Sequence, residues 1–139
     1  MTIQNPLFAG IDAGGTTFKC GVSDASGKVL NKHRVRVTTP EETLSACAEY
    51  FKSATSNSNL KALGIASFGP IDIDRTSKTY GTILATPKPN WAGTDLREFF
   101  TNALATETVV DTDVNGALLA EMTTGAAQSA SSAVYITIG

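Results

Sequence analysis

Asp12-Ala13-Gly14-Gly15-Thr16-Thr17 is the stretch of sequence that decides the fold. It follows the apolar run Leu7-Phe8-Ala9-Gly10-Ile11, which predicts a buried strand, and it precedes a second segment of alternating residues. The two glycines permit a tight turn, so we predict a hairpin whose free backbone N–H groups face an anion such as phosphate. Asp12, at the end of the first strand, is suited to hold a hydrated magnesium ion. An ordinary hairpin is the alternative, because Gly-Gly is a common turn pair.

The residues that follow this turn are predicted to complete an antiparallel meander of three strands. Apolar and polar residues alternate in segments 18–23 and 29–37, with a turn at Asp24-Ala25-Ser26-Gly27 between them. Thr39-Pro40-Glu41-Glu42 then supplies a capping threonine, a proline for the first helical position and a glutamate placed to complete a capping box. A helix should therefore follow, cover one face of the sheet and end in the polar run 53–59.

The second half of the chain alternates strands with helices, which predicts parallel strands added to the meander. Residues 60–67 form a nearly continuous apolar run, typical of a central strand. The later elements expected are a small edge hairpin within residues 71–84, a helix from near Thr94, a strand at 108–110, and a helix at 113–122 with Asp113 as its N-cap. The predicted fold class is α/β, an antiparallel three-strand meander extended by parallel strands and flanked by helices.

Composition limits the classes of partner. The 139 residues are 42% hydrophobic and 17% charged, which is enough apolar material for a folded core. The formal net charge is −2, whereas a sequence-independent binder of nucleic acid or membrane surfaces needs a basic face. We therefore expect a small-molecule ligand, no nucleic acid, no membrane and, without a recognisable leader, a cytoplasmic location. Cys20 and Cys47 lie in apolar surroundings, which favours reduced core thiols over a disulfide or a metal pair.

Four segments resemble the ROK family of sugar kinases, especially its bacterial fructokinase branch. They are Gly10-Ile11-Asp12-Ala13-Gly14-Gly15-Thr16, Gly64-Ile65-Ala66-Ser67-Phe68-Gly69-Pro70-Ile71-Asp72, Thr86-Pro87-Lys88-Pro89-Asn90-Trp91 and Asp111-Thr112-Asp113-Val114-Asn115-Gly116-Ala117. The first motif alone is shared by many sugar kinases, but the four together occur in the family's order over nearly the whole chain. The resemblance implies the N-terminal lobe of an actin-like or hexokinase-like ATPase, which is a ribonuclease H-like fold.

What the resemblance implies for function is ATP-dependent phosphorylation of a hexose hydroxyl, with ATP and Mg²⁺ as cofactors and fructose as the best single substrate. Asp113 matches the family's catalytic base, whereas its position alone favours a helix cap. The family's first phosphate motif matches Asp12, Gly14, Gly15, Thr16 and Thr17, with Asp12 holding magnesium through water. Sugar contacts are implied for Ser67, Phe68, Gly69, Lys88, Asn90, Trp91 and Asn115.

Alternatives also remain for Thr17, Asn90 and Trp91, and for Asp111 in the fourth segment. Many relatives have lysine where this chain has Thr17, which removes a positive charge from the phosphate motif at that position. Relatives also vary at the position of Asn90, where glycine is common. Trp91 is equally suited to anchor its loop in the core. Asp111 is either a partner of the site residues or simply the end of its strand.

The C-terminal residues predict that the chain is the N-terminal lobe of a longer kinase. We expect this lobe at residues 1–124, a hinge or linker at 125–132, and the first strand of a truncated second lobe at 133–139. Val134-Tyr135-Ile136-Thr137-Ile138-Gly139 resembles the strand that enters the family's second phosphate loop, ending at the first glycine. Such a fragment is expected to be inactive alone, with its last strand poorly ordered or paired with another molecule. The full-length kinase is expected to be a homodimer, and a zinc site in its second lobe is left open.

Two other functions are compatible with the same motifs. One is a ROK kinase for glucose, mannose or an N-acetylated amino sugar, which only the second lobe would distinguish from a fructokinase. The other is a non-catalytic ROK sugar-sensing protein, such as a repressor with an N-terminal winged helix domain. The first strand begins by about Leu7, so we expect no such domain, and the aspartate that repressors can lose is present as Asp113.

Overall fold

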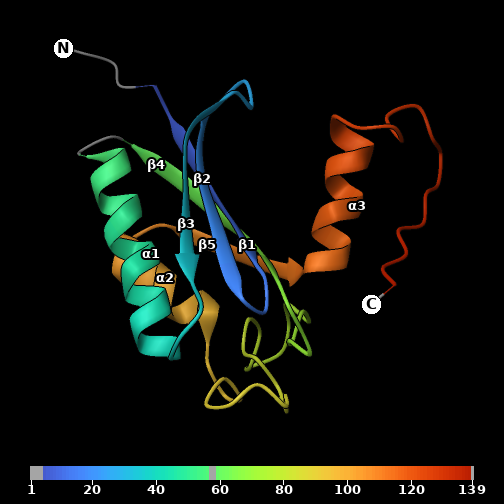
Figure 1. The fold of residues 1–139 in the computed structure, drawn as a ribbon. Coiled ribbons are helices and arrows are strands. Elements are labelled where there is room, and N and C mark those ends of the chain that lie inside the picture. Colours follow the sequence, from blue (N-terminus) through green and yellow to red (C-terminus); the bar gives the residue numbers. More distant parts are fainter. Residues whose placement is uncertain (1–4, 57–58, 139) are drawn as a thin grey trace.

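A computed structural model describes residues 5–56 and 59–138 of the chain. Five strands form one mixed sheet in the order β3-β2-β1-β4-β5, and three helices flank it (Figure 1). The strands are β1 (Leu7–Ala13), β2 (Thr17–Asp24), β3 (Val29–Arg36), β4 (Leu60–Ser67) and β5 (Glu107–Thr112). The helices are α1 (Pro40–Thr55), α2 (Leu96–Leu104) and α3 (Asp113–Thr123). The predicted α/β class, with its meander extended by parallel strands, is confirmed.

The strand registers bring three segments of the chain to one edge of the sheet. β1, β2 and β3 pair antiparallel, whereas β4 pairs parallel with both β1 and β5. Ala13 lies beside Ser67, which in turn lies beside Thr112, so the three parallel strands end at the same level. The glycine-rich turn after β1, the loop after β4 and helix α3 after β5 therefore begin side by side, where open α/β sheets bind ligands.

The hydrophobic core lies between the sheet and helices α1 and α2, which share one face, while α3 covers part of the other (Figure 1). Alternation along β1 and β2 turns Ile11 and Phe18 into this core, and α1 contributes Phe51 and Cys47. Cys20 and Cys47 are free and buried. The neighbouring Cys47 and burial raise the pKa of the Cys20 thiol far above its ordinary range, so this thiol stays protonated.

Capping fixes the start of α1 as the sequence predicts. The Thr39 hydroxyl accepts a hydrogen bond from the N–H of Glu42 at 3.3 Å, and Pro40 is the first helical residue. In a capping box, the Glu42 carboxylate would accept the backbone N–H of Thr39. Here it accepts a hydrogen bond from the Thr38 hydroxyl instead, at 2.8 Å, so the predicted capping box does not form. The helix ends at Thr55; residues 57 and 58 of the predicted polar end lie outside the described residues.

Side-chain hydrogen bonds change two predicted elements. The expected edge hairpin is reduced to an isolated bridge between Ile71 and Ile83. Asp72 folds the intervening residues into a loop, because its carboxylate accepts hydrogen bonds from Ser77 and Thr79 at 2.6 Å each. Helix α2 begins at Leu96, two residues later than predicted, because Asp95 is the residue that accepts the N–H of Glu98, at 2.8 Å.

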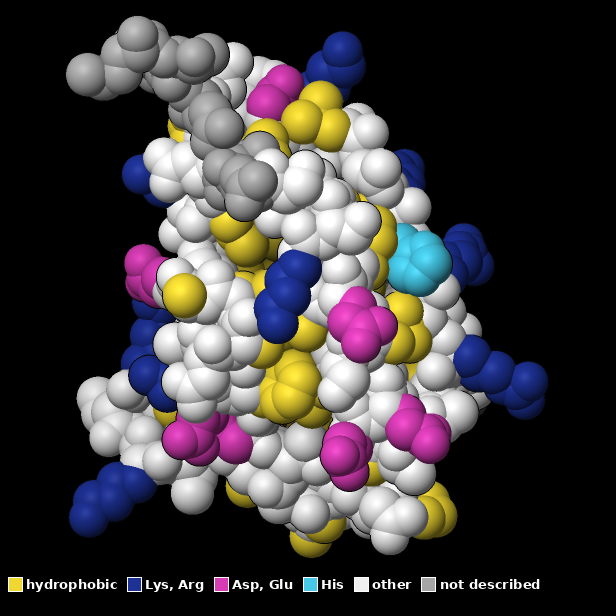
Figure 2. Space-filling view, turned by 90° about the vertical axis from the view of Figure 1, so that its left-hand side faces the viewer, with side chains coloured by type: hydrophobic (Ala, Val, Ile, Leu, Met, Phe, Trp, Pro, Cys, Tyr) yellow, Lys and Arg dark blue, Asp and Glu magenta, His cyan; other side chains and the backbone are white. Residues whose placement is uncertain are grey.

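Residues 134–138 form no strand within this lobe, so the predicted first strand of a second lobe stays a prediction. Val134, Ile136 and Ile138 are 85%, 75% and 94% exposed, so no strand among the described residues buries their apolar side chains. Gly139, expected to open a second phosphate loop, lies outside the described residues. On the α1 side of the molecule, acidic and basic side chains are interspersed rather than gathered by sign (Figure 2).

Candidate active site

The glycine-rich turn between β1 and β2 is closed by one backbone hydrogen bond, from the N–H of Gly14 to the carbonyl of Thr17 at 3.1 Å. A Cβ at Gly14 would lie 2.9 Å from that carbonyl oxygen, so the turn itself requires glycine there. A Cβ at Gly15 would meet nothing within 4 Å. The N–H groups of Gly15 and Thr16 form no hydrogen bond within the described residues. The turn thus presents two free donors to solvent, as an anion-binding hairpin requires.

Asp12 is the penultimate residue of β1, close to this turn, and is paired with a cation that was not predicted from the sequence. The Lys19 ammonium lies 2.9 Å from Asp12 Oδ2, and the two residues face each other across the β1–β2 ladder. Their side chains are 51% and 54% exposed, so the pair contributes only about 0–1 kcal/mol to stability. The register of the predicted hairpin could have revealed this ion pair, because residues directly opposite each other on one face of two paired strands interact.

Asp113 is the first residue of α3 and not its N-cap, which corrects the sequence-based expectation. Thr112 is the cap: its hydroxyl accepts a hydrogen bond from the N–H of Asn115 at 3.1 Å. The carboxylate of Asp113 instead accepts the N–H of Val114 at 2.9 Å and remains exposed. Both Thr and Asp are good caps, so the sequence could not decide between them. Because the cap is Thr112, the Asp113 carboxylate is not needed to start the helix.

Asp12 and Asp113 line one small cavity of about 210 Å³, although they come from β1 and α3. Val114 and Ala117 of α3 and Tyr135 and Thr137 of the C-terminal segment also line it. Asn115, also predicted at the site, is held by Asp111, whose Oδ1 accepts a hydrogen bond from Asn115 Nδ2 at 2.7 Å. The structure therefore brings the predicted base and the predicted magnesium-holding carboxylate to the same opening.

The loop after β4 carries Ser67, Phe68 and Gly69 to the same edge. The N–H of Phe68 donates to the carbonyl of Ala13 at 2.9 Å, which extends the parallel ladder and ties this loop to the hairpin. Ser67 is fully buried and its hydroxyl donates to the carbonyl of Phe68 at 2.9 Å, so it supports the loop and does not reach the surface. Phe68 is partly exposed and Gly69 exposed, so these two residues are accessible.

The proline-rich loop is joined to both of these segments through Lys88. Its ammonium donates to the carbonyl of Gly15 in the hairpin and lies 5.7 Å from the centre of the Phe68 ring. Asn90 is exposed and has a positive φ of 68°, a conformation that asparagine tolerates better than most residues.

Trp91 is a core residue, which argues against the predicted sugar contact. Its side chain is fully buried, and its ring centre lies 5.6 Å from those of both Phe18 and Phe68. Its indole N–H donates to the carbonyl of Thr38 at 3.3 Å. The tryptophan therefore anchors the proline-rich loop from below, while Lys88 and Asn90 of that loop stay accessible.

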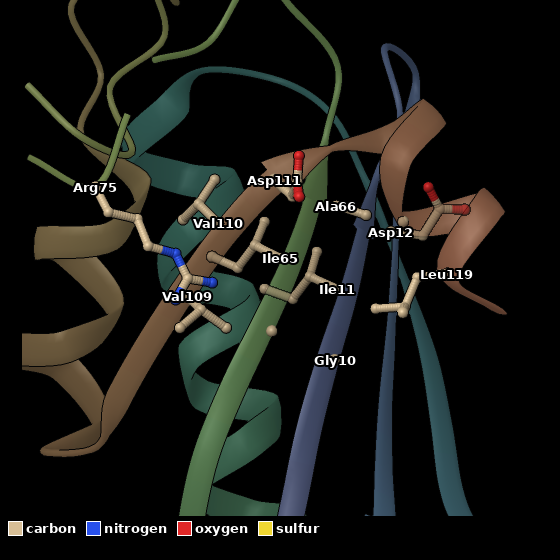
Figure 3. Close-up of a pocket in the computed structure, with 12 residues that line it drawn as sticks. Gly10, Ile11, Asp12, Ile65, Ala66, Arg75, Val109, Val110, Asp111 and Leu119 are labelled. Atoms are coloured by element: carbon tan, nitrogen blue, oxygen red, sulfur yellow. The ribbon is translucent and has the colours of Figure 1, made fainter. Parts of the chain in front are cut away.

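A larger cavity of about 370 Å³ lies between α3 and strands β1, β4 and β5 (Figure 3). Its wall is mainly aliphatic, and Arg75 extends toward Val109 at one side. Asp12 and Asp111 stand at the ends of their strands on its border. Sugars need several polar partners, so this aliphatic space does not fit a hexose. Within the described residues, no group of three or more His, Cys, Asp or Glu side chains could hold a metal ion.

Comparison with known proteins places this geometry in a family. The model of the ROK family matches residues 8–139. The chain belongs to the ROK family. It is 43% identical to a fructokinase from Zymomonas mobilis, with all of this chain and 47% of that protein covered. It is 41% identical to a fructokinase from Streptococcus mutans, covering 98% of this chain and 45% of the relative. The chain thus spans less than half the length of these ROK proteins.

Comparison with solved structures also finds a ROK protein. The ROK family glucokinase from Streptomyces griseus, crystallised with glucose and AMPPNP, matches 88% of this chain and 38% of its own, with 29% identity and a TM-score of 0.74. The actin-like and hexokinase-like fold predicted for this part of the chain is confirmed by that match. No helix among the described residues is both long and apolar enough to cross a bilayer.

Sequence reasoning missed Gly116 as a residue that positions the ROK site. A Cβ at Gly116 would lie 2.5 Å from the Cβ of Ala66, far inside ordinary contact. Only glycine therefore lets α3 approach β4 closely enough to place Asp113 beside Asp12. Its position inside a helix, where glycine is unfavourable by about 1 kcal/mol relative to alanine, is the signal that could have pointed to it.

Proposed function

We propose that the full-length ROK protein containing this chain transfers the γ-phosphoryl group of ATP to a hexose hydroxyl, and that fructose is its substrate. The observation that carries the proposal is the meeting of Asp12 and Asp113 at one cavity, beside a turn with two free N–H donors. The names of the similar ROK fructokinases support fructose, and the glucose and AMPPNP bound by the Streptomyces griseus glucokinase support a sugar and a nucleotide.

Asp113 acts as general base in this proposal. The Val114 N–H holds one carboxylate oxygen at 2.9 Å, and no side chain among the described residues donates to the carboxylate. It is therefore oriented but still able to accept the proton of a sugar hydroxyl. Asn115, two residues further along α3 and fixed by Asp111, is proposed to contact the same sugar.

The hairpin and Asp12 serve the nucleotide. The free N–H groups of Gly15 and Thr16 are suited to phosphate oxygens. Asp12 is a single half-exposed carboxylate, so it fits a magnesium ion that keeps most of its waters and is bound mainly by phosphates. When bound, magnesium would neutralise charge that develops on the transferred phosphoryl group. Lys88 holds the hairpin to the sugar-side loop through Gly15, which couples the two halves of the site.

The test is a coupled assay of ADP release by the full-length protein with fructose, glucose, mannose and N-acetylated amino sugars. We expect the highest kcat/KM with fructose and a fall in kcat of roughly 100-fold or more in Asp113→Asn. Glu107→Gln is the matched control, because Glu107 is exposed at the opposite end of β5. Absence of ADP release with every sugar, or full activity of Asp113→Asn, would reject the proposed reaction.

We also propose that residues 1–139 do not phosphorylate sugars alone and that the full-length protein is a homodimer. The relatives are more than twice as long as this chain, which leaves room for a second lobe that supplies the remaining nucleotide contacts. The same coupled assay on the purified 139-residue chain tests the first statement, with measurable turnover as the contrary result. Light scattering of the full-length protein tests the second.

A further inference from the structure

The ion pair between Lys19 and Asp12 has no evident structural purpose. It is the only salt bridge among the described residues, and both side chains are about half exposed, at 54% and 51%. A pair so exposed contributes little to folding. Its ammonium nevertheless lies 2.9 Å from the carboxylate of Asp12, the penultimate residue of β1, close to the turn with free N–H groups. The cation is therefore at the place where phosphate oxygens are expected.

Strand alternation puts Lys19 on the functional face of the sheet. Phe18 and Cys20 are buried in the core on the α1 side, so Lys19 points to the opposite face. That is the face on which α3 packs and on which Asp12 and Asp113 share a cavity. Lys19 thus belongs to the candidate active site by its position as well as by its contact with Asp12.

Further cations adjoin Lys19 on this face. In the β2–β3 ladder, Arg34 lies opposite Lys19 and Arg36 lies opposite Thr17, and both arginines are exposed. Neither arginine has a carboxylate within salt-bridge distance among the described residues. A basic strip, defined by Lys19, Arg34 and Arg36, therefore runs across two strands to the glycine-rich turn. Such a strip attracts a polyanion and opposes the negative charge of the two aspartates.

We propose that Lys19 is a phosphate-binding residue of the nucleotide site. Without nucleotide its ammonium pairs with Asp12; with nucleotide it contacts an oxygen of the terminal phosphates as a compact positive charge. The exchange would leave the Asp12 carboxylate available to hold a hydrated magnesium ion. The inference rests on the proposed function for the identity of the ligand, but the contact itself can be measured without any sugar.

The experiment uses the full-length protein and AMPPNP, with affinity measured by titration calorimetry and ATP and sugar KM measured by the coupled assay. Lys19→Met should weaken AMPPNP binding and raise the ATP KM by roughly 10- to 100-fold, while the sugar KM changes less than about twofold. Lys19→Arg should recover most of the affinity. Lys61→Met is the control, because Lys61 is exposed at the other end of β4.

Two further variants separate phosphate contact from an effect on Asp12 alone. The relocation variant Thr17→Lys with Lys19→Met returns an ammonium to the same face of β2 and should restore at least part of the lost affinity. In an Asp12→Asn background, Lys19→Met should still weaken AMPPNP binding if the ammonium touches phosphate. If Lys19 acts only by pairing with Asp12, the substitution has no effect in that background, and the proposal is rejected.

The outcomes also separate this inference from the proposed function. A protein that binds AMPPNP but phosphorylates no sugar rejects the kinase reaction, while the affinity of Lys19→Met still decides the role of Lys19. An AMPPNP affinity of Lys19→Met within about twofold of the parent rejects the phosphate contact even if sugar phosphorylation is confirmed. A parent protein that binds no AMPPNP rejects both.

Discussion

Gly116 lies where α3 packs closely against Ala66 of β4, and the substitution Gly116→Ala tests whether that close packing positions Asp113. The added Cβ would lie 2.5 Å from the Cβ of Ala66, whereas ordinary contact begins at 3.4 Å. The backbone fixes both Cβ atoms, so no change of rotamer relieves the overlap. Helix α3 must therefore move away from the sheet by about 1 Å, and Asp113 moves with it.

Two opposing terms set the effect of Gly116→Ala on stability. Overpacking of this kind destabilises by about 1–3 kcal/mol, whereas alanine favours a helix over glycine by about 1 kcal/mol. The free energy of unfolding should therefore fall by only about 0–2 kcal/mol. Activity should fall much further, because displacing a positioned catalytic group by about 1 Å lowers the rate by about 100-fold.

The assay compares kcat with the urea midpoint for the full-length protein and three variants. Gly64→Ala is the matched control: it adds the same methyl group to β4, two residues before Ala66, where a Cβ would meet nothing within 4 Å. Ala66→Gly combined with Gly116→Ala removes the methyl group that causes the overlap and should recover activity. Full kcat in Gly116→Ala, or no recovery in the double variant, would refute the reasoning that this contact places Asp113.

Two further predictions concern the loops around the site. Trp91→Phe should lower stability by about 1 kcal/mol through loss of the indole hydrogen bond, with little change in the sugar KM; a large rise in that KM would place Trp91 at the sugar. Hydrogen bonds from Ser77, and to a smaller extent from Thr79, lower the pKa of Asp72. The ionised carboxylate therefore stabilises the loop at neutral pH, and this stabilisation is lost as the pH falls below the ordinary aspartate pKa of about 3.9. Ser77→Ala should raise this pKa in a carboxyl NMR titration, and an unchanged value would contradict the assignment.

Local patterns were sufficient to predict most of the fold, because each element carries its own signals. Thr39 and Pro40 mark the start of α1, and the apolar run of β4 indicates a strand buried on both faces. Elements that depend on side-chain hydrogen bonds were less predictable. The loop around Asp72 replaces a hairpin because its carboxylate gathers two hydroxyl groups, and an alternation of apolar residues does not reveal such bonds.

The candidate site was predictable as a set of residues but not as a division of roles. Trp91 and Lys88 lie in one motif, yet one is buried against Phe18 while the other reaches Gly15. Partners so distant in the chain are set by tertiary packing, which single-sequence patterns do not encode. Gly116 was hidden for the same reason: its requirement comes from the Cβ of Ala66 on another element.

The residues proposed to carry the chemistry contribute little to holding the fold together. Asp12 and Lys19 form an exposed pair, and Asp113 is exposed at the end of a helix that Thr112 caps. The core that fixes their positions lies on the other face of the sheet, and strand register alone sets the level at which β1, β4 and β5 end. Substituting these residues should therefore leave the protein folded, so a loss of nucleotide binding or turnover reports directly on the site.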